Sequence, residues 1–233
     1  MKRTTRARYA ALAAMLLLVL GTVVCLADEY TVVFKNHSTM VGDVCIYQHE
    51  PDMAVHNVMS LAWFSKGAAP TTTISFTWSI DYCFAWDEIG ELVPGVVFEA
   101  DQIWDADLKT HNQITLTTIH GDIYTFADQT EGKYSGNLYI LGDVSVVSNQ
   151  VAVGIGMSGK PTHVAPAQPN WEWVYTPKPT YWITFGTFEE GEVLDIESIS
   201  SFAKIQFPPN VYSMTAVLQP DNTWRVFPTS QGE

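Results

Sequence analysis

The chain has 233 residues, of which 47% are hydrophobic and 12% aromatic, so it can bury a large core and is not a disordered protein. It carries 12 basic and 25 acidic residues, which gives a formal net charge of −13. Because a surface of this sign repels phosphate groups, the composition argues against nucleic-acid and anionic-membrane partners.

The first 27 residues have the pattern of a Sec-type signal peptide. Residues 1–8 are basic, residues 10–24 are apolar, and Cys25 and Ala27 are small residues at the −3 and −1 positions of a cut before Asp28. The alternatives are a retained anchor, for which the apolar stretch is short, and a lipoprotein, for which Val24 is too bulky. We therefore predict a secreted or periplasmic protein of residues 28–233, with no stable membrane span after cleavage.

Cleavage would make the protein more acidic. The leader holds the four basic residues Lys2, Arg3, Arg6 and Arg8 and no acidic ones, so a chain of 12 basic and 25 acidic residues would be left with a net charge of −17. The usual consequence of such a charge is solubility.

The first half of the mature chain reads as short strands separated by turn residues. Strands are expected at 30–35, 43–48 and 61–64, and an aromatic block at 74–104 supplies about four more. In that block apolar and polar residues alternate from Ile74 to Trp78, which is the period of a half-buried strand. We interpret its aromatic residues as the central core.

The second half continues in the same way. A hairpin is expected between 113–119 and 123–126 across the turn His120-Gly121-Asp122, and a second one near the end of the chain. The remaining strands are expected at 137–141, 151–157, 162–167, 171–175, 181–185, 204–207, 211–218 and 223–227, with one short helix around 196–200. The sequence thus predicts an all-β protein, an antiparallel β-sandwich of about 15 short strands with little helix, as a single domain over residues 28–233.

Two cysteines, Cys45 and Cys83, are left in the mature chain. Export would place them where a disulfide can persist, and a bridge between them would stabilise the fold by roughly 3–4 kcal/mol. Both also lie in strand-like segments, so they could equally be two buried thiols that act as small apolar residues. The sequence leaves these two possibilities open.

The sequence contains only weak matches to motifs for cofactor binding, catalysis or metal binding. Gly154, Gly156 and Gly159 have the spacing of a dinucleotide-binding loop, but strand signals follow them where a helix should begin, so we interpret them as a strand with a close backbone approach. No nucleophile motif and no paired metal-ligand spacing is present. Asp101, Asp105 and Asp107 could contribute to a calcium site, since Asp105 and Asp107 would share a strand face, although a solvated edge explains them better. We predict no catalytic residue, metal or cofactor.

Tryptophans are the more informative candidates for binding. Trp171 and Trp173 share one face of an expected strand, and Trp182 lies on a neighbouring segment. An exposed row of such rings could stack on sugar rings, whereas a buried row would belong to the core. The sequence therefore names Trp171, Trp173 and Trp182 as candidate ligand-stacking residues.

A family resemblance extends over almost the whole mature chain. The strings VVFKNHS, ISFTWSIDYCFAW, LVPGVVFEADQ, VAVGIGMSG, YWITFG and FPPNVYSMTAVLQPDNTWRV together resemble the RhiA family, named for a protein that Rhizobium expresses in the rhizosphere. The resemblance implies a soluble protein without an established activity, and it transfers no site residue. The terminal DNTW segment is similar, more loosely, to inclusion-body proteins of the PixA/AidA type, which implies self-assembly.

These observations give three expectations for function. The first is a secreted, non-enzymatic β-sandwich protein that acts by binding or self-association, with a polysaccharide or itself as partner. The second is a carbohydrate-binding module that uses aromatic stacking. The third is a secreted hydrolase whose catalytic residues are dispersed along the sequence.

Overall fold

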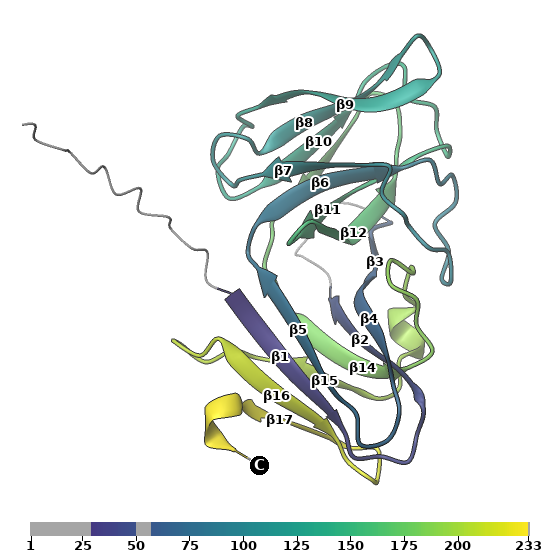
Figure 1. Ribbon diagram of the computed structural model, residues 1–233. Helices are drawn as coiled ribbons and strands as arrows, with labels where there is room; N and C mark the ends of the chain where they lie inside the picture. Colours follow the sequence, from purple (N-terminus) through teal and green to yellow (C-terminus); the bar gives the residue numbers. More distant parts are fainter. Residues whose placement is uncertain (1–28, 50–56, 233) are drawn as a thin grey trace, which may run out of the picture.

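The computed structural model describes residues 29–49 and 57–232, so the predicted signal peptide of residues 1–27 lies outside the described residues (Figure 1). The described chain consists of 17 strands and two short 3-10 turns, which confirms the predicted all-β fold with little helix. Neither described range contains a helix that is long and apolar enough to cross a membrane.

The strands form four sheets that are stacked in two sandwiches, one above the other in Figure 1. The strand bounds are β1 Glu29–Asn36, β2 Gly42–Gln48, β3 Met59–Ser60, β4 Ala62–Ala68, β5 Thr73–Ser79, β6 Tyr82–Asp87, β7 Gln102–Ala106, β8 Gln113–Ile119, β9 Ile123–Thr130, β10 Leu138–Gly142, β11 Ala152–Met157, β12 Lys160–Pro166, β13 Trp171–Tyr175, β14 Tyr181–Gly186, β15 Phe202–Ile205, β16 Ser213–Leu218 and β17 Trp224–Pro228. The 3-10 turns are Ile196–Ser198, where the sequence predicts a short helix, and Thr229–Gln231.

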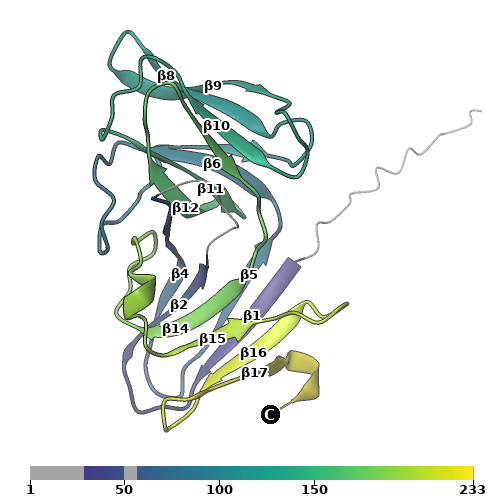
Figure 2. The same ribbon diagram turned by 180° about the vertical axis from the view of Figure 1, so that it is seen from behind.

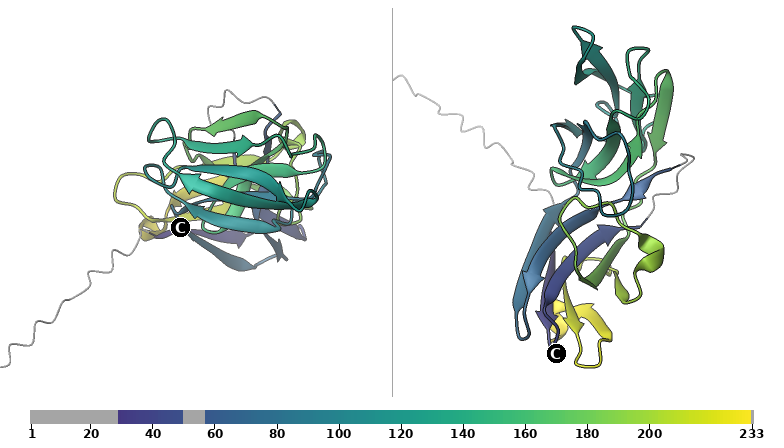
Figure 3. Two further views of the ribbon diagram at one scale, coloured as in Figure 1. Left: turned by 90° about the horizontal axis from the view of Figure 1, so that it is seen from above. Right: turned by 90° about the vertical axis from the view of Figure 1, so that its right-hand side faces the viewer.

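The lower sandwich pairs a β1 sheet, in the order β17-β16-β1-β5, with a β2 sheet, in the order β15-β14-β2-β4. The upper sandwich pairs a β8 sheet, in the order β13-β10-β8-β9, with a β6 sheet, in the order β3-β12-β11-β6-β7. The right-hand view of Figure 3 shows the two sandwiches stacked along the long axis of the molecule. Most pairings are antiparallel, as expected, but β1 pairs in parallel with β16 and β8 in parallel with β10.

Each sandwich has its own core, and the aromatic block 74–104 contributes to both. Phe76 and Trp78 of β5 lie in the lower core, whereas Phe84 and Trp86 of β6 lie in the upper core. Because β5 buries only one face, it alternates between exposed and buried residues, while β6 is covered on both faces and is buried almost throughout. The block supplies three strands, and residues 88–101 form a loop in which Phe98 covers the second face of the β6 sheet.

The two sandwiches are joined by short connections and by side chains that enter both. Only Ile80 and Asp81 separate β5 from β6, a connection that the back view in Figure 2 lets the reader follow. Only Leu61 separates β3 from β4. Met157 of β11 packs in the lower core, and Tyr82 of β6 packs against both cores. These contacts fix one sandwich against the other.

The glycines that resemble a dinucleotide-binding loop have a structural role in the hairpin of β11 and β12. A Cβ atom on Gly154 would lie 2.0 Å from the His163 carbonyl oxygen, and one on Gly156 would lie 2.1 Å from the Lys160 carbonyl oxygen. Only glycine fits there, because the two strands approach closely at a bulge between Ile155 and Gly156. The interpretation as a strand with close backbone approach is confirmed.

Candidate functional site

The three candidate tryptophans do not form a common platform. Trp171 is 52% exposed, whereas Trp173 is 2% exposed and belongs to the upper core. Trp182 lies on β14 in the lower sandwich, where it is half-buried. Its ring contacts that of Phe202 at a centroid distance of 5.4 Å, and the Lys204 ammonium lies 5.8 Å from its centroid.

Trp171 and Trp173 differ although they share one face of β13. Trp173 lies opposite Ile140 in the middle of β10, beneath the other sheet of the sandwich, and Trp171 lies opposite Gly142 at the end of β10. The alternation of side chains along a strand correctly places both tryptophans on one face of β13. It does not say where along the strand the opposing sheet ends, and this decides which of the two rings is covered.

Cys45 and Cys83 are buried free thiols on strands of different sheets. Burial raises the pKa of the Cys83 thiol to about 12 and that of the Cys45 thiol further still. Neither group is therefore suited to nucleophilic chemistry near neutral pH.

The carboxylate of Asp107, considered above as a calcium ligand, is instead hydrogen-bonded within a local turn. Its carboxylate accepts hydrogen bonds from the backbone N–H groups of Thr110 and Lys109, at 2.7 and 2.6 Å, and from the Thr110 hydroxyl. The Thr110 N–H bond is the main reason that the pKa of Asp107 is held well below its usual range. In residues 29–49 and 57–232, no group of three or more His, Cys, Asp or Glu residues is placed to hold a metal ion.

The structure instead places an aromatic groove at one end of the lower sandwich, where the β1 and β2 sheets meet. It has a volume of about 380 Å³. Its lining comes from the start of β1, the β5–β6 connection, the start of β14 and the end of β15, and consists of Tyr30, Ile80, Pro179, Thr180, Tyr181, Lys204, Ile205, Gln206 and Phe207. We call this feature the aromatic groove.

Phe207 is the centre of the aromatic groove. Its ring meets that of Tyr30 edge-on at a centroid distance of 4.9 Å, and it meets Tyr181 and Trp78 edge-on at 6.0 and 5.9 Å. Edge-to-face contacts at these distances stabilise aromatic pairs beyond the burial of their area. The walls are therefore a set of mutually braced rings.

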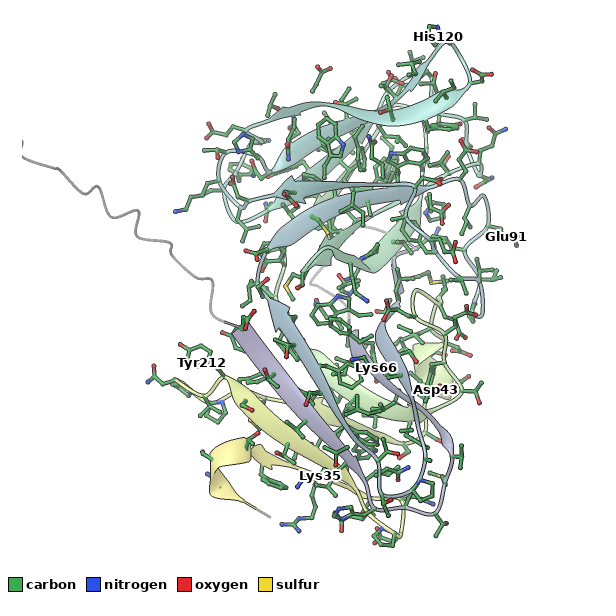
Figure 4. The ribbon with its side chains drawn as sticks, viewed as in Figure 1. Lys35, Asp43, Lys66, Glu91, His120 and Tyr212 are labelled. Atoms are coloured by element: carbon green, nitrogen blue, oxygen red, sulfur yellow. The ribbon has the colours of Figure 1, made fainter. Side chains whose placement is uncertain are left out.

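Tyr212 extends the aromatic surface to the rim. Its ring lies 5.5 Å from that of Tyr30 and is 40% exposed, and its carbonyl oxygen accepts the N–H of Thr31 at 2.8 Å. Figure 4 shows Tyr212 on the loop before β16, beside the beginning of β1. A ligand in the groove could thus contact one exposed ring and the edges of two half-buried ones.

A buried polar group lies beneath the floor of the groove. Tyr181 is 6% exposed and lies close enough to the Trp78 indole for that group to lower its pKa, but its Oη makes no hydrogen bond of good geometry to any described residue. The same is true of Nε1 of Trp78, whose ring lies 4.9 Å from that of Tyr181. Burial raises the pKa of Tyr181 to about 12, so its hydroxyl is protonated and can both donate and accept. A buried hydroxyl without a well-formed hydrogen bond is costly, but this one is closed to solvent, so a ligand oxygen could satisfy it only after the surrounding rings shift.

A larger cleft of about 650 Å³ lies beside the upper sandwich and is a weaker candidate. Its lining includes Met59, Glu91, Leu92, Asn149 and Pro166, and it has neither an aromatic wall nor a buried polar atom that lacks a partner. It also borders the point where the described chain resumes after residue 56. The smaller aromatic groove has the chemistry that the larger cleft lacks.

The aromatic groove could not be found from the sequence. Tyr30, Tyr181 and Phe207 lie in segments far apart along the chain, and each is one aromatic residue among many in strand-like surroundings. They meet because β1 and β14 begin at the same end of the sandwich. The one local signal was the string FPPN, in which two prolines follow Phe207 and end the strand-like segment.

Two comparisons with known proteins point to the same family over most of the chain. The family profile described as RhiA matches residues 27–229. The chain is 37% identical over 203 residues to "Protein RhiA" of Rhizobium leguminosarum bv. viciae, an alignment that covers 86% of this chain and 87% of that protein. No solved structure matches the chain significantly. The chain therefore belongs to the RhiA family.

Proposed function

We propose that this chain is an exported, non-enzymatic binding protein whose aromatic groove takes a saccharide ring. The single observation that carries the proposal is a concavity lined by the rings of Tyr30, Tyr181 and Phe207, with the exposed ring of Tyr212 at its rim. The sites that proteins use for small molecules are concave and mostly apolar, with a few polar groups that fix the orientation.

The chemistry of the walls favours a saccharide over a purely apolar ligand. The C–H face of a sugar ring can stack on the exposed ring of Tyr212, while a hydroxyl group turned inward can bond the Tyr181 Oη once the rings above it shift. The side chains of Lys204 and Gln206, which line the groove and lie on exposed residues, can bond further hydroxyls. A hydrocarbon ligand would leave the Tyr181 hydroxyl unsatisfied.

The test is a glycan array with the mature chain, residues 28–233, followed by calorimetry on any saccharide that binds. Tyr181→Phe removes only the hydroxyl and Tyr212→Ala removes the rim ring. We expect each to weaken binding about tenfold or more, which is the loss of one good hydrogen bond or stacking contact. Tyr134→Ala, which removes a 60% exposed ring in the upper sandwich, is the matched control and should bind as the unaltered chain does.

Two results would contradict this assignment. One is the absence of binding to every saccharide on the array, and the other is binding that Tyr181→Phe and Tyr212→Ala leave unchanged. Because the Tyr181 hydroxyl makes no hydrogen bond of good geometry to the described residues, Tyr181→Phe is expected to fold normally. Its loss of binding could therefore not be attributed to unfolding.

Export is the second part of the proposal, and it is supported by the basic and apolar segments that precede Asp28. When the full chain is expressed in a Gram-negative host, we expect the product in the periplasm or medium, with Asp28 as its first residue. N-terminal sequencing of the fractionated protein checks this. A product that keeps Met1 and stays in the cytosol would show that the leader assignment is wrong.

A further inference from the structure

Strand β13, Trp171–Tyr175, is an edge of the β8 sheet. Among the described strands it pairs only with β10, without a register shift, so that Leu138 lies opposite Tyr175, Ile140 opposite Trp173 and Gly142 opposite Trp171. The right-hand view of Figure 3 shows this green strand on the outer side of the upper sandwich. One side of its backbone is therefore free to accept another strand.

The hydrogen bonds of β10 determine which backbone groups of β13 face outward. The N–H of Tyr139 donates to the Asn112 carbonyl at 2.7 Å, so the backbone of Tyr139 faces β8. Because the direction alternates along a strand, Ile140 faces β13 and bonds with Trp173. The N–H and C=O groups of Glu172 and Val174 consequently point away from the sheet.

The other edge strands are protected in ways that β13 is not. Proteins protect edge strands with charged residues (lysine above all), prolines, bulges, short strands or covering side chains. Of the seven other edge strands, three carry basic residues or proline: Lys204 on β15, Arg225 and Pro228 on β17, and Lys66 on β4. Two have a backbone carbonyl that accepts a hydrogen bond from a side chain, namely Ser75 of β5 from the Lys66 ammonium and Asp105 of β7 from the Gln129 amide. Strand β9 has a register shift near Asp128, and β3 is only two residues long. Strand β13 has the sequence WEWVY, whose one charged residue is Glu172, and among the described residues it has no basic residue, proline or register shift.

We propose that β13 pairs with β13 of a second copy of this chain, antiparallel and centred on Trp173, to form a continuous eight-stranded sheet. A twofold axis at Trp173 sets Glu172 of each copy opposite Val174 of the other. The outward N–H and C=O groups of one strand then meet those of its partner in register. This arrangement is independent of the aromatic groove, which lies in the other sandwich.

The side chains around β13 fit a second copy rather than a different partner. Antiparallel pairing sets Glu172 opposite an apolar residue, so the two carboxylates are not directly opposed. Trp171, 52% exposed, would cover the end of the partner's strand. Val144 and Val147, 78% and 48% exposed, follow β10 in the loop beside Trp171 and would flank the contact. A strand that is self-complementary in this way selects itself.

Sedimentation and light scattering of the mature chain over a wide range of concentration test the proposal. The unaltered chain should form dimers as concentration rises, and more salt should promote them because both copies are acidic. Val174→Pro removes the outward N–H and leaves every bond to β10 in place, so we expect its dimer dissociation constant to rise about tenfold or more. Val174→Ala keeps the N–H and is the matched control.

Amide hydrogen exchange of the unaltered chain provides a second readout that does not depend on folding of the proline variant. The N–H groups of Trp173 and Tyr175 should be protected at every concentration, whereas those of Glu172 and Val174 should become protected only as dimers form. A chain that stays monomeric throughout would overturn the proposal. So would a dimer in which neither Val174→Pro nor the exchange of Glu172 and Val174 has any effect.

Discussion

The Oγ1 of Thr162 lies 3.0 Å from Nδ1 of His163, and this contact determines the state of a fully buried imidazole. The Thr162 hydroxyl donates its hydrogen to the Ile155 carbonyl at 3.2 Å, so it can only accept from the ring. Nδ1 therefore carries the proton of the neutral His163. Nε2 is left as a buried acceptor without a partner among the described residues.

His163 should make the protein sensitive to acid. Burial, with a smaller contribution from His49, lowers the pKa of His163 from 6.5 to about 3 in the folded protein. The unfolded chain binds a proton below pH 6.5 and the folded chain does not, so stability is lost as pH falls through 6.5 towards 3. Between pH 7 and pH 5 this one residue should cost about 2 kcal/mol of unfolding free energy.

Urea unfolding at the two pH values checks this effect by difference. His163→Gln cannot take up a proton, so its stability should fall by about 2 kcal/mol less than that of the unaltered chain between pH 7 and pH 5. His120→Asn, at an exposed hairpin turn with φ of 56°, is the control and should behave as the unaltered chain. Equal losses in all three proteins would contradict the account.

Asp87 should change the pH dependence of stability in the opposite direction to His163. Its Oδ2 accepts the N–H of Glu99 at 2.7 Å, but burial and the neighbouring Asp101 raise its pKa from 3.8 to about 6. The folded state therefore favours the protonated acid, so the stabilisation is full below pH 3.8 and is lost as pH rises through 6. At pH 8 the ionised Asp87 lies beside a second carboxylate and is destabilising.

Asp87→Asn removes this charge while its amide oxygen can still accept the Glu99 N–H. We expect the variant to be roughly 1–2 kcal/mol more stable than the unaltered chain at pH 8, less than the whole pKa shift implies because solvent reaches Asp101. The gain should disappear at pH 4. Thermal unfolding at the two pH values, with Asp122→Asn in an exposed turn as control, measures it. A variant that is less stable at pH 8 would show that ionised Asp87 is needed.

How much of this molecule was predictable depends on how local each feature is. The alternation in β5 and the turn between β8 and β9 are local patterns, and both elements form where the sequence predicts them. The parallel pairing of Val32 with Met214 joins segments at opposite ends of the chain, and no local pattern specifies it. The same non-local pairing separates Phe76 and Phe84 into different cores, although they belong to one aromatic block.

Candidate sites were harder to predict than strands for a related reason. An aromatic residue at period two gives the face of a strand, and Trp171 and Trp173 show that the face does not give exposure. The aromatic groove needs the ends of several strands to coincide, which only the packing of the two sheets decides. What the sequence did provide was the expectation that aromatic stacking would be the chemistry of any binding site.

The two tryptophans of β13 should differ sharply in their effect on stability. Trp173→Ala empties a space in the upper core and is expected to cost roughly 3–5 kcal/mol of unfolding free energy. Trp171→Ala removes a ring that is 52% exposed and should cost less than about 1 kcal/mol. Denaturant unfolding at a concentration where the chain is monomeric compares them. Similar losses in both variants would mean that Trp171 is as well packed as Trp173.

The two cysteines provide the last prediction, on the redox state of the exported protein. Because burial raises the pKa of Cys83 to about 12, only roughly one thiol in ten thousand is ionised at pH 8 even before steric protection is considered. Cys45 is shielded at least as strongly, since it is 0% exposed between the β2 sheet and the residues that follow β14.

Iodoacetamide should therefore leave both cysteines unmodified in the folded chain and label both in denaturant without reductant. Ser135→Cys adds a thiol at an exposed turn and should be labelled in the folded state, which shows that the reagent is active. A peptide that links Cys45 to Cys83, or labelling that requires a reductant, would instead establish the disulfide that the sequence left open.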